Sequence, residues 1–325
     1  MRKEQPLISI AVITYNSSKY VLETLESAKS QTYQNIELII SDDCSTDETV
    51  DICRCWIEKN KNCFVRTELI TISQNTGISA NVNRALRLMN GEWIKLIAGD
   101  DILFSRAIES HVEFISQKEH KDAAIVVSSV EIFKNNIENK LYVWPNFKFS
   151  NNLREQLRLQ LMGNFIKAPG VFINREILIH KFGGFNEKYL MLEDDPLWIL
   201  FLTNGYTFHF NNEVLVGYRI HDNSVSNGEI FTNEDAGNIT TQFNFGDDLN
   251  RFKNEVSFPT MLKNRFYLEF FLCWIDFYIF KRKLYVGDTF FSIFYKIARK
   301  IIACFLKILS IYNWLIYIVL SKLKM

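Results

Sequence analysis

Four short apolar, β-branched runs near the start of the chain constrain the fold more than any other feature. They lie at residues 7–14, 36–40, 65–72 and 93–97, and segments with helical spacing separate them. This alternation of strands and helices is typical of a sheet whose two faces are both covered by helices. The sequence therefore predicts an α/β, Rossmann-like fold with a mostly parallel sheet.

A polar group follows each of the four predicted strands. In a parallel sheet these groups share one edge, and ligands bind at that edge in open α/β folds. Each group alone is also compatible with an ordinary turn or helix cap, but four in succession favour a shared pocket. The groups are Thr14-Tyr15-Asn16, Ser41-Asp42-Asp43, Asn75-Thr76-Gly77 and Gly99-Asp100-Asp101.

The predicted pocket is acidic, and its loops lack the glycine-rich motifs of dinucleotide sites and P-loops. Adjacent carboxylates such as Asp100 and Asp101 are costly to bury unless they are paired or bind a metal. A nucleotide diphosphate bridged to the protein by a divalent cation fits this chemistry best.

These motifs resemble the start of glycosyltransferase family 2. The resemblance is strong over residues 6–130 and weaker over 165–226, and it implies a GT-A fold and an inverting transfer. The matching segments are residues 8–16, 30–33, 37–47, 75–80, 91–93 and 100–101.

The resemblance implies roles for individual donor-side residues. Thr14 and Tyr15 would border the nucleobase, and Asp43 would hydrogen-bond it, typically as uracil. Asp100 would contact the ribose or the metal shell, and Asp101 would ligate Mn²⁺ or Mg²⁺. The adjoining Asn16 and Gly77 are predicted to lie in the same donor site.

The chain departs from the family pattern at four positions. Ile13 stands where Pro is usual, Cys44 where Gly is common, Val82 where Arg is frequent, and Ala98 where a fuller motif has its first acid. The change at Ala98 leaves the metal fewer carboxylates. His221, in a Tyr-Arg-x-His sequence that is similar to one in the family, is the expected additional metal ligand.

A second acidic cluster lies at residues 192–198, with Glu193 and Asp194 at its centre. By itself it is compatible with a capped helix start, because acids and Pro are favoured in a first helical turn. The resemblance implies instead that Asp194 is the general base toward the acceptor, with Glu193 as a neighbour that tunes it. Trp198 is expected to pack in the core rather than against an acceptor sugar.

The C-terminal region differs in composition from the rest of the chain. The whole chain has a formal net charge of zero, but residues 281–325 hold nine basic residues and one acid, which gives +8. Apolar residues dominate between the basic ones, so an amphipathic helix lying on a membrane surface is the favoured interpretation. A membrane span, or an oligomerisation helix that would make the protein a homo-oligomer, remains an alternative.

The predicted organisation is a catalytic domain at 1–226, an irregular linker at 227–262 and a membrane-associating helical region at 263–325. The six cysteines match no zinc spacing, and residues 1–6 show no apolar signal region. The sequence thus predicts a cytoplasmic enzyme, peripheral on the inner face of the membrane, with no nucleic-acid partner.

The expected reaction is transfer of a single sugar from a UDP-sugar to a glycan or lipid-linked acceptor in surface polysaccharide synthesis. Single addition is expected because the chain lacks the Gln-x-x-Arg-Trp motif of processive synthases. A sugar nucleotidyltransferase and a non-catalytic, glycan-binding or partner-binding paralogue are the alternatives.

Overall fold

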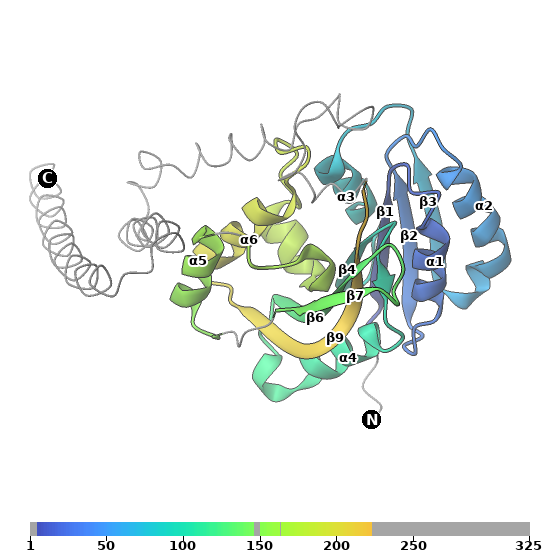
Figure 1. Ribbon diagram of the computed structural model, residues 1–325. Coiled ribbons are helices and arrows are strands. Elements are labelled where there is room, and N and C mark those ends of the chain that lie inside the picture. Colours follow the sequence, from blue (N-terminus) through green and yellow to red (C-terminus); the bar gives the residue numbers. More distant parts are fainter. Residues whose placement is uncertain (1–4, 146–149, 163, 223–325) are drawn as a thin grey trace, which may run out of the picture.

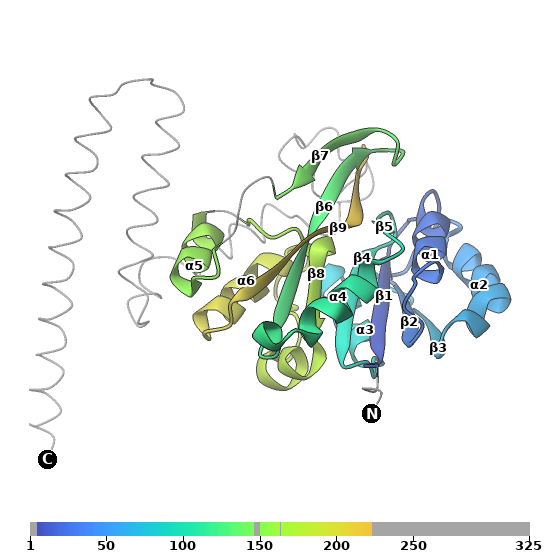
Figure 2. The same ribbon diagram turned by 90° about the horizontal axis from the view of Figure 1, so that it is seen from below.

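The computed structural model describes residues 5–145, 150–162 and 164–222. The described part is one curled, mixed sheet with helices against both faces (Figures 1 and 2). The strand order along the sheet is β3-β2-β1-β4-β8-β6-β9-β5, and β7 pairs with β6. The predicted linker and membrane-associating region, 227–325, lie outside the described residues.

The first half of the sheet is the parallel unit that the sequence predicts. β2 and β4 flank β1 in parallel, and β3 pairs in parallel with β2. Helices connect these strands, as a parallel arrangement requires. The strands are β1 (Ile8–Thr14), β2 (Ile36–Asp42), β3 (Arg66–Thr71) and β4 (Trp93–Ala98), and the helices are α1 (Val21–Lys29), α2 (Thr49–Asn60) and α3 (Ile78–Leu86).

The second half of the sheet is mixed, and here the prediction of a mostly parallel sheet needs correction. β8 runs antiparallel to both β4 and β6, and β5 runs antiparallel to β9. Only β9 pairs in parallel with its neighbour β6. The strands are β5 (Ile102–Leu103), β6 (Ile125–Lys134), β7 (Lys140–Trp144), β8 (Val171–Asn174) and β9 (Phe208–Ile220).

The remaining helices are α4 (Ala107–Ser116), α5 (Leu153–Met162) and α6 (Asp194–Thr203), with a wide π-type turn at Ile177–Lys181. Short 3₁₀ turns occur at Lys61–Cys63, Lys118–His120 and Ala168–Gly170. No helix in the described part of the chain is long and apolar enough to cross a membrane.

Alternating side chains of the central strands form two separate cores. Ile8, Ile10 and Val12 of β1 pack on the face covered by α1, α2 and α4, whereas Ala11 belongs to the cluster on the opposite face. That second cluster contains side chains of α3, α5 and α6. Because successive strand residues point to opposite faces, both sides of β1 are buried, which explains why the strand is apolar except at Ser9 and Thr14.

Candidate active site

The carboxyl ends of β1, β2 and β4 meet at one edge of the sheet, as expected. The Asp43 amide donates to the Thr14 carbonyl oxygen over 3.0 Å, and the Gly99 amide donates to the Ile13 carbonyl oxygen over 2.9 Å. The loop after β3 joins them, because the Thr76 amide donates to Asp43 Oδ2 over 3.0 Å. All four predicted strand ends therefore lie close together, and we call this edge of the sheet the donor edge.

Asp43 holds this edge together. Its carboxylate accepts from the Thr76 hydroxyl at 2.7 Å and from the Gly77 amide at 2.8 Å. Arg84 of α3 adds an ion pair, with its Nη2 3.1 Å from Asp43 Oδ1. The sequence motifs did not single out Arg84. Its position in the last turn of α3, the helix that directly follows the 75–77 motif, is the signal that would have found it.

The loops after β1 and β2 are bonded to each other. Asn16 Oδ1 accepts from the Thr46 amide at 2.8 Å, and the Asn16 amide donates to the Ser45 hydroxyl, also at 2.8 Å. Thr14 is buried, and its hydroxyl donates to Asp42 Oδ2 over 2.8 Å. Tyr15, between them, is partly exposed at the same edge.

Backbone geometry shows what one departure from the family pattern requires of the chain. Cys44 has φ +69°, in the left-handed region that glycine adopts most easily. The family's common Gly therefore matches the conformation at this position, and Cys44 adopts it in spite of its Cβ.

Gly77 links the donor edge to the acceptor-side segment. It has φ +88°, and a Cβ there would lie 2.7 Å from the Leu190 carbonyl oxygen. Next to it, the Ile78 amide donates to the same oxygen over 2.7 Å, and the Ser79 hydroxyl donates to the Tyr189 carbonyl over 2.5 Å. The 189–190 segment therefore contacts the start of α3 at the donor edge, just before the chain reaches Glu193 and Asp194.

The adjacent carboxylates Asp100 and Asp101 lie in different surroundings. Asp100 is 27% exposed, and its Oδ2 is 2.9 Å from His221 Nε2. Asp101 is fully buried, and its Oδ1 accepts from the Arg219 amide over 2.8 Å. Burial, followed by the neighbouring Asp100 carboxylate, raises the pKa of Asp101 well above its usual value. This geometry favours Asp100, rather than Asp101, as the carboxylate that a ligand at the edge can reach.

The Asp100–His221 pair fits a divalent cation that is shared with a phosphorylated ligand. A carboxylate oxygen and an imidazole nitrogen are suitable ligands for Mn²⁺, and Mg²⁺ accepts one or two carboxylates together with phosphate oxygens. No group of three or more His, Cys, Asp or Glu side chains in the described ranges is arranged to hold a metal. Phosphate oxygens and water would complete the coordination.

Asp194 begins helix α6 and has a defined hydrogen-bond environment. Asn164 Nδ2 donates to its Oδ2 over 2.6 Å, and the Asp195 amide donates to its Oδ1 over 2.7 Å. Burial is the main cause that raises the pKa of Asp194. Burial, and then the Asp194 carboxylate, raise the pKa of Glu193 to about 8. Two adjacent acids with raised pKa values are typical of a site for proton transfer.

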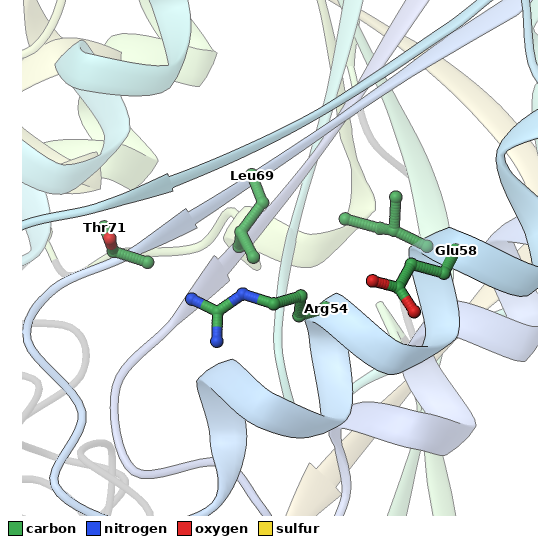
Figure 3. A pocket seen from close by; sticks show the side chains of 5 residues that line it. Arg54, Glu58, Leu69 and Thr71 are labelled. Atoms are coloured by element: carbon green, nitrogen blue, oxygen red, sulfur yellow. The ribbon is translucent and has the colours of Figure 1, made fainter.

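Trp198 packs in the core, as expected: it is 1% exposed and belongs to the cluster beneath α6. Figure 3 shows a hollow between α2 and β3, which is lined by Arg54, Ile57, Glu58, Leu69 and Thr71. None of the predicted site residues lines it, so this hollow does not bear on the donor edge.

Curated relatives of the chain are glycosyltransferases. An uncharacterized glycosyltransferase from Rickettsia typhi is 29% identical over 68% of this chain and 66% of its own length. The Escherichia coli protein WfaP, a UDP-Glc:α-D-GlcNAc-diphosphoundecaprenol β-1,3-glucosyltransferase, is also 29% identical, over 68% of this chain and 80% of its own length.

Solved structures share the fold at low sequence identity. Staphylococcus aureus TarS matches with a TM-score of 0.57 and 20% identity, over 83% of this chain and 42% of TarS. Its 1–349 fragment, solved with UDP-GlcNAc, matches with a TM-score of 0.51 and 18% identity, over 83% and 80% of the two chains. A mannosyltransferase from Pyrobaculum calidifontis, solved with GDP-Man and Mn²⁺, matches with a TM-score of 0.50 and 18% identity, over 68% and 59%.

The model of the family described as "Glycosyl transferase family 2" matches residues 9–188, which include every motif of the donor edge. The chain belongs to glycosyl transferase family 2.

Proposed function

We propose that this protein is an inverting, metal-assisted glycosyltransferase that moves a single sugar from a UDP-sugar to a glycan or lipid-linked acceptor in surface polysaccharide synthesis. The observation that carries the proposal is the junction at Gly77, where the 189–190 segment bonds to the donor edge. At this junction the edge proposed to bind the cation contacts the segment that leads to Asp194.

The proposed donor is a uridine nucleotide. WfaP is named for its use of UDP-Glc, and the TarS fragment was solved with UDP-GlcNAc. Asp43 lies beside Thr14 and Thr76, where the resemblance expects the base to bind. Its carboxylate bonds to the 76–77 loop, so base binding and the position of that loop would be coupled.

Asp100 and His221 would hold the divalent cation. The buried Asp101 would help to keep the neighbouring Asp100 in position. When bound, the cation would neutralise charge on the diphosphate leaving group. The structural neighbour solved with GDP-Man and Mn²⁺ is consistent with such a requirement.

Asp194 would be the general base. The acceptor hydroxyl oxygen forms a bond to the anomeric carbon, the bond from that carbon to the diphosphate oxygen breaks, and the hydroxyl proton passes to Asp194. The two donors on its carboxylate, Asn164 Nδ2 and the Asp195 amide, fix its orientation and leave lone pairs for the proton. A pKa raised by burial makes this carboxylate a stronger base than a solvated one.

Nucleotide binding tests the donor side directly. Isothermal titration with UDP and GDP, each with and without Mn²⁺, should show preference for UDP and tighter binding with the cation. Asp43→Asn should reduce the preference for UDP, whereas Asp51→Asn, at a position in an exposed ion pair on α2, should not. Equal affinity for UDP and GDP, or no effect of Mn²⁺, would contradict the proposal.

A further inference from the structure

Arg219 is a fully buried cation that the proposed reaction does not use. It lies near the end of β9, two residues before His221, and is 1% exposed. A buried guanidinium is costly unless its donors are paired. What Arg219 pairs with therefore indicates what the structure gains from it.

The donors of Arg219 reach three separate segments around the acidic pair. Its Nε donates to the Asp100 carbonyl oxygen over 2.6 Å, Nη1 donates to the Asn135 carbonyl oxygen, and Nη2 forms an ion pair with Glu23 of α1. Its own amide donates to Asp101 Oδ1 over 2.8 Å. One residue thus bonds to both members of the acidic pair.

Two rings enclose the same guanidinium. The Arg219 Cζ atom lies 4.3 Å from the centre of the Tyr20 ring and 4.7 Å from that of Phe133. The Tyr20 ring also packs against the His221 imidazole, with centroids 4.9 Å apart. Arg219 therefore contacts the backbone of Asp100 and, through Tyr20, the ring of His221.

We propose that Arg219 is a positioning residue that keeps the Asp100 carboxylate and the His221 imidazole at cation-binding distance. This inference rests on the proposed function, because it concerns the same cation. The planar, five-donor guanidinium can bond to three segments while it stacks between two rings, which a lysine ammonium does not do. The shape of Arg219, and not only its charge, is therefore required.

The test compares Arg219→Lys with the wild-type full-length chain. Mn²⁺ affinity in the presence of UDP is measured from the free-ion EPR signal, and the nitrogen coupling of bound Mn²⁺ reports the His221 ligand. Arg219→Lys should lower Mn²⁺ affinity at least tenfold and weaken the nitrogen coupling, whereas UDP affinity without the cation changes less than twofold. Arg106→Lys, at an exposed arginine that pairs with Glu109, should match wild type.

A second variant covers the case in which Arg219→Lys fails to fold. The Glu23 side chain is 59% exposed. Glu23→Ala therefore removes a partner of the Arg219 guanidinium without opening the core. It should also lower Mn²⁺ affinity, by several-fold. Wild-type Mn²⁺ affinity and nitrogen coupling in either folded variant would overturn the inference. Failure of the wild-type chain to bind UDP would instead contradict the proposed function.

Discussion

Asp100 and Asp101 show how strongly a single position changes the chemistry of a carboxylate. Asp100 is partly exposed beside His221, whereas Asp101 is enclosed and bonded to the backbone of β9. The sequence predicts that both acids lie at a sheet edge, but it cannot predict which one faces outward. That depends on the pairing of Ile102 and Leu103 with β9, more than a hundred residues later.

Asp194→Asn tests the proposed base. The amide is nearly the same size but cannot accept the acceptor proton, so turnover should fall by about 10²–10⁴-fold. UDP affinity should remain near wild type because Asp194 is on the acceptor side. Steady-state turnover and nucleotide titration measure the two effects, with Asp51→Asn as control. An Asn variant with normal turnover would remove Asp194 as the base.

The elements of the parallel half follow closely from local sequence. The predicted runs at 36–40 and 93–97 correspond to β2 and β4, because strands buried on both faces are mostly apolar. Glu37 and Lys95 are the buried charged exceptions within these runs. The second half was less predictable. The antiparallel insertion of β8 and the position of β9 between β6 and β5 depend on pairing between distant segments. The sequence does not single out Arg84 or Arg219 either, because their partners also lie on distant segments.

The turn between β3 and α3 provides a test of the junction at Gly77. Gly77→Ala should destabilise the fold by about 1–3 kcal/mol because φ is positive and the new Cβ meets the Leu190 carbonyl oxygen. Gly205→Ala is a matched control, since Gly205 also has a positive φ, of +89°, but nothing lies within 4 Å of the added Cβ.

Denaturant unfolding of both variants measures the difference, and nucleotide titration shows whether it reaches the donor edge. Gly77→Ala should lose more stability than Gly205→Ala and should bind UDP more weakly. Equal losses in the two variants would mean that contact with the 190 segment contributes nothing.

The acidic start of α6 should make stability depend on pH. The pKa of Glu193 is raised to about 8, so the folded state keeps this proton at pH values where the unfolded chain has lost it. The unfolded state then binds fewer protons, and stability falls as pH rises from about 4.5, the ordinary value, to about 8.

Glu193→Gln should remove this part of the dependence. Between pH 5 and pH 8 its Tm should fall less than that of the wild type, as measured by thermal unfolding at a series of pH values. Parallel Tm curves for the two proteins would show that Glu193 titrates as it does in the unfolded chain.

For the whole molecule, charge distribution gives the main prediction about location. Residues 281–325 carry a net +8, from nine basic residues and one acid. Each basic residue near an anionic membrane contributes about 1 kcal/mol of attraction, which salt screens. We propose on this ground that the C-terminal region brings the enzyme to the membrane that holds a lipid-linked acceptor.

Deletion of residues 290–325 should therefore abolish sedimentation with vesicles that contain anionic lipid. The full chain should bind these vesicles at low salt, bind less at high salt, and bind neutral vesicles weakly. Retention of the truncated protein on anionic vesicles would place the membrane contact elsewhere in the chain.

The position of β9 in the sheet has a consequence for synthesis of the protein. This strand is the last described element, yet it lies between β6 and β5 and carries Arg219, with His221 just beyond it. Chains leave the ribosome N-terminus first, so strands β1 to β4 are made long before β9 can complete the second half of the sheet. A nascent or prematurely ended chain therefore has Asp100 without His221 and an unpaired edge on β6. Incomplete products would lack the cation pair and would expose a strand edge prone to aggregation.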